Sequence, residues 1–396
     1  MWMKKNATDF KVKNQRVIIR CDLNVPIKDG VITDDTRIKA SVETIEYLLN
    51  GNAKVIVLSH LGRVKEESDK VTNTLAPVAK RLSELLYKEV KFIPFTRGIE
   101  VENAVNSMEP GDIIMLENTR FEDLDGKKES GNDLELAKYW ASLGDIFIND
   151  AFGTLHRSHA SNVGIGSILP SAMGFLVKEE VEKISSALNN PEKPFVIMLG
   201  GAKVSDKIGV IENAVKIADS VIIAGGMHFT FYKAMGLNIG SSIVDEESIE
   251  FCKRMLELYP DKIVLPDDIV VASSLSEGAT TRLINKEDIQ PNDIGVDIGV
   301  QTQNKFRTIL MNAETIIWNG PVGVFEINKF SQGTRKIVEM LSDSRAKIVV
   351  GGGDTIAALN KFGFNNRKAH ISTGGGASLE MLEGKELPGL KVISDK

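Results

Sequence analysis

Short apolar runs rich in Val and Ile recur along the chain, and stretches with helical spacing lie between them. The runs span residues 16–23, 53–60, 89–95, 112–118, 145–152, 194–201, 220–226, 262–268, 315–321, 347–354 and 370–376. The helical stretches include 38–49, 75–86, 134–143, 205–218, 328–341 and 355–362. Near-continuous apolar runs are typical of strands covered on both faces, and their alternation with helices is typical of doubly wound sheets. The pattern therefore predicts an α/β protein with parallel sheets.

These runs are too many for one comfortable open sheet, so we expect two sheets in two domains. A chain of 396 residues also exceeds the usual size of one hydrophobic core. A stretch rich in Gly, Ser and Pro places the boundary within 164–194. We place the first domain at 1–173, a connecting helix at 174–190 and the second domain at 191–384. The expected fold class is thus α/β, with two doubly wound, Rossmann-like parallel-sheet domains joined by a hinge helix.

The connecting helix is predicted from one apolar stripe, formed by Val177, Val181, Ile184 and Leu188. A helix with a single stripe is suited to packing at the junction of two domains. An ordinary helix that covers one domain has the same pattern, so the stripe leaves both interpretations open.

The composition and charge of the chain limit the classes of function that it can have. The formal net charge of −6 gives no general affinity for nucleic acid or anionic membranes, so an anion site must be a local concentration of basic residues. The only cysteines, Cys21 and Cys252, form neither a metal-ligand spacing nor a disulfide framework, which fits a reducing compartment. The sequence shows no signal-like apolar region and no apolar run of membrane-spanning length. We expect a cytoplasmic protein without membrane or nucleic-acid partners.

The first half of the chain places charged side chains where its predicted strands end, the usual location of ligands in an open α/β sheet. These residues are Asp22, Asn24, His60, Arg63, Arg120, His156, Arg157 and His159. Arg37 opens the next helix, where a cation opposes the helix dipole and is better explained by a ligand. Each residue alone is more often a solvated surface charge, but the repeated placement favours a shared site for a small polyanion. We expect His159 and His228 to be ordinary structural histidines.

The second half places glycines at the strand ends instead, in segments 200–203, 224–227, 319–323, 351–355 and 373–378. Glycine lets backbone N–H groups approach phosphate oxygens, and helix N-termini favour anions. Lys203 and Lys207 are four residues apart, so we expect them on one helix face. Asp354 follows three glycines and is a candidate Mg²⁺ ligand.

The two halves together predict an enzyme that transfers a group between a polyanion and a nucleotide, with closure to exclude water. Neither a P-loop nor the dinucleotide fingerprint is present in the sequence. A nucleotide-linked dehydrogenase is the rival enzyme class, because doubly wound sheets commonly bind dinucleotides. A two-domain solute-binding protein is the non-enzymatic rival, and it predicts an export signal.

At these residues the chain closely resembles the phosphoglycerate kinase family, nearly from end to end. The matching segments are RCDLNVP (20–26), SHLGR (59–63), LENTRF (116–121), NDAFGTLHRSHAS (149–161), LGGAKVSDKI (199–208), WNGPVGVFE (318–326), GGGDT (351–355) and STGGGAS (372–378). The resemblance implies the reversible Mg²⁺-dependent transfer of a phosphoryl group between 1,3-bisphosphoglycerate with ADP and 3-phosphoglycerate with ATP, in glycolysis and gluconeogenesis. It also implies a monomer whose partners are these small molecules.

The resemblance further implies roles for individual residues. The substrate would be bound by Asp22, Leu23, Asn24, Arg37, His60, Leu61, Gly62, Arg63, Arg120 and Arg157. The nucleotide would be bound by Lys207, Gly225, Gly226, Gly295, Pro321, Glu326, Gly352, Gly353, Asp354 and Thr355. Catalytic contacts to the phosphoryl group would come from Arg37, Lys203, Lys207, Gly374, Gly375 and Gly376. Within these sets Glu326 would contact the ribose, Asp354 would hold Mg²⁺, and the C-terminal segment 385–396 would return to the first domain.

The chain departs from the family pattern at a few positions that are not charged or glycine site residues. These positions are Cys21, Val64, Thr119, Ala224 and Val300. The resemblance therefore leaves the activity in place and puts only rates and loop stiffness in doubt.

Overall fold

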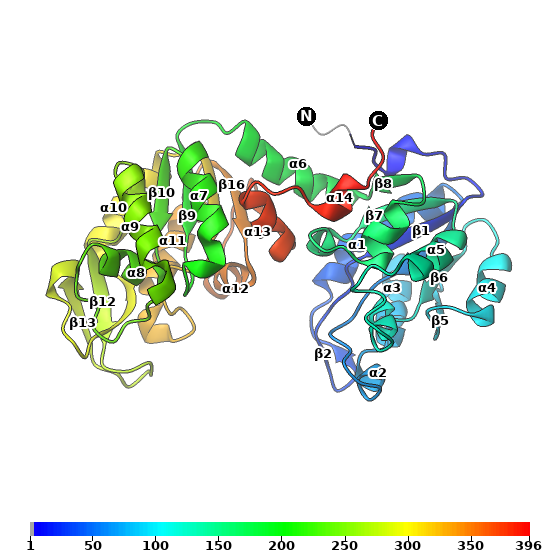
Figure 1. Cartoon of the computed structure of the whole chain (residues 1–396), viewed down its shortest axis with the longest axis horizontal. Helices are drawn as coiled ribbons and strands as arrows, with labels where there is room; N and C mark the ends of the chain where they lie inside the picture. The colour runs from blue at the N-terminus through cyan, green and yellow to red at the C-terminus, as the bar shows by residue number, and fades with distance from the viewer. Residues whose placement is uncertain (1–3) are drawn as a thin grey trace. The chain divides into compact units, whose positions relative to one another are not determined.

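The structure of the protein is a computed structural model that describes residues 4–396. The chain divides into two compact units (Figure 1). Unit 1 contains the residues up to Glu182 together with Glu386–Lys396, and unit 2 contains Lys183–Lys385. The boundary between them falls inside helix α6 (Phe175–Asn189).

Unit 1 is built on a six-stranded parallel sheet with the strand order β5-β6-β4-β1-β7-β8. Its strands are β1 (Arg16–Cys21), β4 (Lys54–Leu58), β5 (Lys91–Ile93), β6 (Ile113–Leu116), β7 (Ile146–Asp150) and β8 (Ser171–Met173), with a separate hairpin of β2 (Ile27–Lys28) and β3 (Val31–Ile32). Its α-helices are α1 (Thr36–Asn50), α2 (Asp69–Thr72), α3 (Ala76–Leu86), α4 (Ile99–Asn106), α5 (Leu134–Ser142) and α14 (Pro388–Lys391).

Alternate residues of the strands in unit 1 belong to two separate cores. Val17 and Ile19 of β1 pack in a cluster with residues of α1 and α3 such as Ile45. Ile18 packs instead in a cluster with residues of α4 and α5 such as Trp140. Because successive side chains of a strand point to opposite faces, every residue of a doubly covered strand is buried. This explains why these strands read as continuous apolar runs.

Unit 2 contains a second six-stranded parallel sheet with the order β11-β10-β9-β15-β16-β17. Its strands are β9 (Phe195–Leu199), β10 (Ser220–Ile223), β11 (Ile263–Val264), β15 (Thr315–Asn319), β16 (Lys347–Gly351) and β17 (His370–Ile371). Its α-helices are α7 (Ile208–Ile217), α8 (Met227–Ala234), α9 (Ile249–Leu258), α10 (Val300–Met311), α11 (Gln332–Asp343), α12 (Gly353–Phe362) and α13 (Gly376–Leu382). Two parallel sheets with helices between their strands confirm the predicted α/β fold class.

Unit 2 also contains a three-stranded antiparallel sheet that the sequence analysis did not predict. It consists of β12 (Asp268–Ala272), β13 (Thr281–Asn285) and β14 (Ile294–Ile298) in the order β13-β12-β14. The run at 262–268, expected to be one strand, forms only the short β11 before β12 begins. The available signal was the Ser- and Gly-rich loop between the β-branched segments of β12 and β13, which is typical of a hairpin.

The C-terminal segment of the chain packs within unit 1. Gly389 donates a backbone hydrogen bond to the carbonyl oxygen of Leu155 at 2.8 Å, and Ser171 Oγ donates to the carbonyl oxygen of Val392 at 3.0 Å. Lys4 and Asp395 form an isolated antiparallel bridge. In Figure 1 this red segment runs close to β8.

Candidate active site

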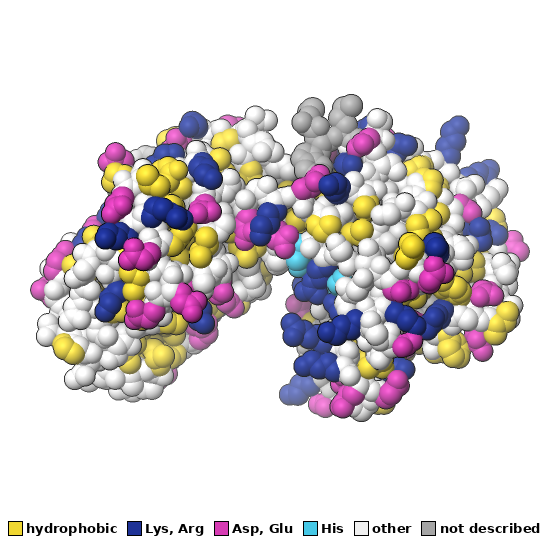
Figure 2. Space-filling view, viewed as in Figure 1, with side chains coloured by type: hydrophobic (Ala, Val, Ile, Leu, Met, Phe, Trp, Pro, Cys, Tyr) yellow, Lys and Arg dark blue, Asp and Glu magenta, His cyan; other side chains and the backbone are white. Residues whose placement is uncertain are grey.

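The carboxyl ends of the central strands of unit 1 carry most of the predicted substrate-binding residues. Because β1, β4, β6 and β7 are parallel neighbours, these ends meet at one edge of the sheet. Asp22 and Asn24 follow β1, His60 and Arg63 follow β4, and Arg120 follows β6. We define the basic cluster as Arg37, His60, Arg63, Arg120 and Arg157. Figure 2 shows Lys and Arg side chains gathered with histidine on one edge of unit 1.

The charges of the basic cluster are only partly neutralised. Burial, followed by the charges of Arg120 and Arg63, lowers the pKa of Arg157. Burial, followed by Arg20, Arg120 and Arg157, lowers the pKa of His60 well below its usual value, so this imidazole is neutral at physiological pH. A bound anion would relieve the repulsion among these cations. In a chain of net charge −6, such a concentration of positive charge is the signature of an anion site.

Two asparagines hold the loops that carry the basic cluster. Asn24 Oδ1 accepts a hydrogen bond from the backbone N–H of Gly62 at 2.9 Å. Asn118 Oδ1 accepts from the N–H groups of Leu61 at 3.2 Å and Arg120 at 3.0 Å. Asn118 was not singled out from the sequence, although an asparagine at the carboxyl end of a predicted strand is a usable signal; in the structure it lies two residues after the end of β6 and is fully buried.

Arg20 is a second residue that the sequence analysis missed. Its guanidinium is fully buried, and its Nη2 atom lies 3.1 Å from His60 Nδ1 while Nε donates to Ser161 Oγ at 2.9 Å. Ser161 in turn donates its backbone N–H to the buried Glu129 at 2.9 Å. This network fixes the orientation of His60. The signal was a single arginine within the otherwise apolar run 17–21.

Arg37 forms an ion pair with a side chain of the same chain. This changes the interpretation that a ligand alone explains a cation at the start of the helix. Its Nη1 atom donates to Asp22 Oδ2 at 2.8 Å, and Asp22 is 9% exposed in the pair. The Asp22 carboxylate therefore explains part of the placement of a cation at the start of α1. The other oxygen of Asp22 has no hydrogen-bond partner among the described residues. Leu23 lies beneath this edge and donates its N–H to Ser59 Oγ at 3.0 Å.

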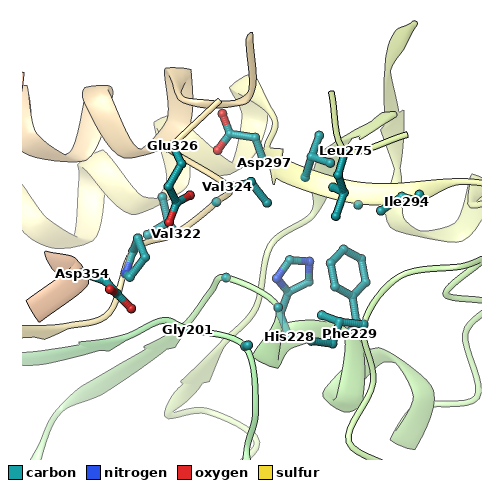
Figure 3. A pocket seen from close by; sticks show the side chains of 18 of the residues that line it. Gly201, His228, Phe229, Leu275, Ile294, Asp297, Val322, Val324, Glu326 and Asp354 are labelled. Carbon is teal, nitrogen blue, oxygen red and sulfur yellow. The ribbon is translucent and has the colours of Figure 1, made fainter. Parts of the chain in front are cut away.

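Unit 2 contains a cavity of about 480 Å³, which we call the unit 2 pocket (Figure 3). Its walls are mostly apolar side chains and glycine backbone, the usual character of a small-molecule site. The lining residues are Gly201, Ala202, Gly225, Gly226, His228, Phe229, Ser241, Ile243, Leu275, Ile294, Gly295, Val296, Asp297, Pro321, Val322, Gly323, Val324, Glu326 and Asp354. Six predicted nucleotide-binding residues line it, namely Gly225, Gly226, Gly295, Pro321, Glu326 and Asp354. The apolar wall from β14 and the 273–280 loop was missed with the three-stranded sheet.

Two glycines of the unit 2 pocket are required by close packing. A Cβ atom at Gly295 would lie 1.9 Å from Cζ of Phe229. Gly225 has φ +63°, and a Cβ there would lie 2.6 Å from the backbone nitrogen of Gly201. A side chain at either position would fill the pocket or displace its wall.

Lys207 lies where the strand order of the unit 2 sheet reverses, between β9 and β15. Its Nζ donates to the carbonyl oxygens of Gly200 at 2.6 Å and Asn319 at 2.7 Å. Burial lowers its pKa to about 8, and the carboxylates of Asp206 and Asp354 oppose this shift. This crevice is the usual ligand position of an open α/β sheet.

Lys203 does not share a helix face with Lys207, so that expectation was wrong. Lys203 is exposed in an irregular segment, whereas Lys207 ends a short 3₁₀ helix (Ser205–Lys207) and precedes α7. Gly201 has φ +108° and α7 begins only at Ile208, so a spacing of four residues does not place the two lysines on one helix turn.

The remaining predicted nucleotide-binding residues lie at the start of α12, outside the lining of the unit 2 pocket. Gly352 has φ +94° and Gly353 opens the helix. Thr355 is buried, and its Oγ1 accepts the backbone N–H of Gly320 at 2.7 Å, next to Pro321. Gly374, Gly375 and Gly376 lead into α13.

The donor set fits magnesium that arrives with a nucleotide. Within residues 4–396, no three His, Cys, Asp or Glu side chains are grouped to hold an ion by themselves. Asp354 is exposed on the first turn of α12 and lines the unit 2 pocket. Mg²⁺ commonly takes one or two carboxylates and completes its shell with phosphate oxygens and water.

Comparison with known proteins decides the family. The sequence model described as phosphoglycerate kinase matches residues 7–385. The chain belongs to the phosphoglycerate kinase family. The phosphoglycerate kinase of Lacticaseibacillus casei (strain BL23) is 54% identical over 392 residues, which cover 98% of this chain and 99% of that protein. The phosphoglycerate kinase of Listeria innocua serovar 6a is 54% identical over 394 residues, covering 99% of this chain and all of that protein.

Solved structures agree with this family. The phosphoglycerate kinase of Coxiella burnetii is similar with a TM-score of 0.91 at 42% identity, and 98% of each chain is covered. The phosphoglycerate kinase of Pyrococcus horikoshii OT3 has a TM-score of 0.83 at 34% identity, again covering 98% of each chain.

As a phosphoglycerate kinase, the chain is a phosphotransferase that acts on a carboxyl group. It transfers a phosphoryl group reversibly between 1,3-bisphosphoglycerate with ADP and 3-phosphoglycerate with ATP, with Mg²⁺, in glycolysis and gluconeogenesis. This confirms the predicted reaction, cofactor and co-substrate. In the described part of the chain, the helices are too short or too polar to span a bilayer.

Proposed function

We propose that the two substrates of this reaction bind to different units of the chain. The basic cluster of unit 1 binds the carboxylate and phosphate of 3-phosphoglycerate, with Asp22 and Asn24 contacting the glycerate hydroxyl. The unit 2 pocket binds the adenine nucleotide, with Glu326 on the ribose and Asp354 on Mg²⁺. The observation that carries this assignment is the separation of chemistry: a cluster of basic side chains that is only partly neutralised lies at strand ends of unit 1, and a glycine-walled apolar cavity lies in unit 2.

The proposed catalytic residues act by positioning and by positive charge. A phosphoryl group in transit spreads its charge over three oxygens, so no covalent enzyme intermediate is needed. Arg37, Lys203 and Lys207, together with the N–H groups of Gly374–Gly376, stabilise that charge. Mg²⁺, when bound with the nucleotide, neutralises part of the phosphate charge. Transfer requires reacting atoms within about 3–3.5 Å, so the two units close on their substrates during the reaction.

Kinetics of four alanine variants test these assignments. Arg63→Ala and Arg120→Ala should mainly raise KM for 3-phosphoglycerate, because they hold the end of the substrate that does not react. Arg37→Ala and Lys203→Ala should mainly lower kcat, by about 10²–10³-fold, the usual loss for one group that stabilises developing charge. Equal effects on KM and kcat in all four variants would contradict the division of roles while leaving the family unchanged.

The same proposal assigns a role to each part of the chain. We assign substrate binding to 1–173 with 385–396, a hinge to 174–190 and nucleotide binding to 191–384. The placement of the unit boundary inside α6 supports this assignment. We further propose a cytoplasmic monomer that does not bind nucleic acid, which sedimentation with and without DNA would test.

A further inference from the structure

Asp297 is a buried carboxylate at the edge of the unit 2 pocket. It lies near the end of β14, is 4% exposed and lines the cavity, where Figure 3 shows it between Glu326 and Leu275. Its Oδ1 accepts the backbone N–H of Ile298 at 2.9 Å, and its Oδ2 accepts that of Gly333 at 2.7 Å. Burial raises its pKa to about 7, and these N–H groups oppose the shift. The described ion pairs do not include it.

Three segments meet at the Asp297 carboxylate, and two glycines make the contact possible. A Cβ atom at Gly333, in the first turn of α11, would lie 2.2 Å from Oδ1. A Cβ atom at Gly323, in the loop after β15, would lie 2.5 Å from the same oxygen. That loop is also held by a hydrogen bond from the N–H of Val324 to the carbonyl oxygen of Val296 at 2.9 Å. The carboxylate therefore hydrogen-bonds β14 and α11 and packs against Gly323 of the 320–326 loop.

The same segments carry the proposed nucleotide contacts. Gly295 precedes Asp297 by two residues on β14, and Pro321 and Glu326 lie at the two ends of the 320–326 loop. We propose that Asp297 is a positioning residue that sets nucleotide affinity by locking these walls of the unit 2 pocket against one another. The inference rests on the proposed nucleotide site, and it assigns no contact between Asp297 and the phosphoryl group.

Asp268 provides a matched control in the neighbouring strand of the same sheet. It is 1% exposed, and it caps α10 by accepting the N–H groups of Thr302 at 2.7 Å and Gln301 at 3.0 Å. A Cβ atom at Gly299 would lie 2.2 Å from its carboxyl carbon, as closely as Gly333 approaches Asp297. Asp268 does not line the unit 2 pocket. The two residues thus share a capping role and differ in their relation to the pocket.

The experiment compares Asp297→Asn with Asp268→Asn in the full-length protein at pH 8, where the Asp297 carboxylate is mainly ionised. Calorimetric titration measures the dissociation constant of ADP, steady-state kinetics measure KM and kcat, and thermal unfolding measures stability. Each variant presents an amide N–H₂ to a backbone N–H, so both should lower Tm. Asp297→Asn should also raise the ADP dissociation constant and KM for ATP about tenfold, with kcat changed less than about twofold. Asp268→Asn should leave both nucleotide constants within about twofold of wild type.

Several outcomes overturn the inference. An unchanged ADP dissociation constant in Asp297→Asn, or an equal change in Asp268→Asn, would make Asp297 only a helix cap. If Asp297→Asn does not fold, Asp297→Ser, which keeps a hydroxyl but shortens the side chain by one bond, is compared with Asp268→Ser in the same assays. Failure of the wild-type protein to bind ADP would instead contradict the proposed nucleotide site.

Discussion

Lys207 is expected to take up a proton when the nucleotide binds above pH 8. Its amine is held by the carbonyl oxygens of Gly200 and Asn319, and burial lowers its pKa from the ordinary 10.5 to about 8. The amine is therefore largely neutral in the ligand-free protein at pH 9. A nucleotide phosphate beside Lys207 favours the charged form, so binding raises its pKa.

The size of the effect follows from linkage between proton and nucleotide binding. At pH 9 a group with a pKa of about 8 holds about 0.1 proton, whereas the same group restored to about 10.5 holds nearly one. ADP binding should thus take up about 0.9 proton at pH 9 and about 0.1 at pH 7. The ADP dissociation constant should rise about tenfold between pH 7 and pH 9, which corresponds to about 1.4 kcal/mol.

Calorimetric titrations of ADP in buffers with different ionisation enthalpies measure this proton uptake. Lys207→Met removes the titrating amine and should abolish both the uptake and the loss of affinity at high pH. Lys216→Met, which removes an exposed lysine of α7, should keep both and serves as the control. An uptake below about 0.2 proton at pH 9 in the wild-type protein, or an unchanged pH dependence in Lys207→Met, would refute the reasoning.

Three further outcomes are expected. Gly295→Ala places a methyl group 1.9 Å from the Phe229 ring and should weaken ADP binding more than tenfold by calorimetry while leaving 3-phosphoglycerate binding intact; loss of both would indicate misfolding instead. Glu129→Ala removes the buried acceptor of the Ser161 backbone N–H and Oγ–H, the serine that also accepts from Arg20, and should lower the free energy of unfolding in urea by about 1–3 kcal/mol. A loss below about 0.5 kcal/mol would contradict a structural role for this network. Small-angle scattering should show a smaller radius of gyration with a nucleotide analogue and 3-phosphoglycerate together than without ligand. An unchanged radius would exclude closure.

Most helices and strands of the two parallel sheets could be predicted from local sequence. Strands such as β1 and β15 are buried on both faces, so burial imposes a continuous apolar run that needs no knowledge of the partner strands. The same reasoning applies to the glycine segments at the strand ends of unit 2, because tight turns restrict the local backbone. The family was recognisable because those segments keep their order and spacing along the chain.

The site geometry needed contacts between residues far apart in the sequence. Arg20 meets Ser161, 141 positions away, and Lys207 meets Asn319, 112 positions away. Sheet order in space differs from strand order in the chain, so no periodicity reveals which strand ends converge. The three-stranded sheet was missed for a related reason, since β13 is largely exposed and lacks the continuous apolar pattern.

The sequence by itself determined that the chain forms parallel α/β sheets with charged strand ends in one half and glycine strand ends in the other. Only the tertiary structure decided that Asp22 would neutralise Arg37, that Lys207 rather than Lys203 would be enclosed, and that Asp297 would lie where two walls of the unit 2 pocket meet helix α11. The physical reason is the sequence distance over which each effect acts. Backbone propensity and the periodicity of burial depend on residues that are near neighbours in sequence. Charge pairing and the pKa of a buried group depend instead on whatever the folded chain brings within a few ångströms.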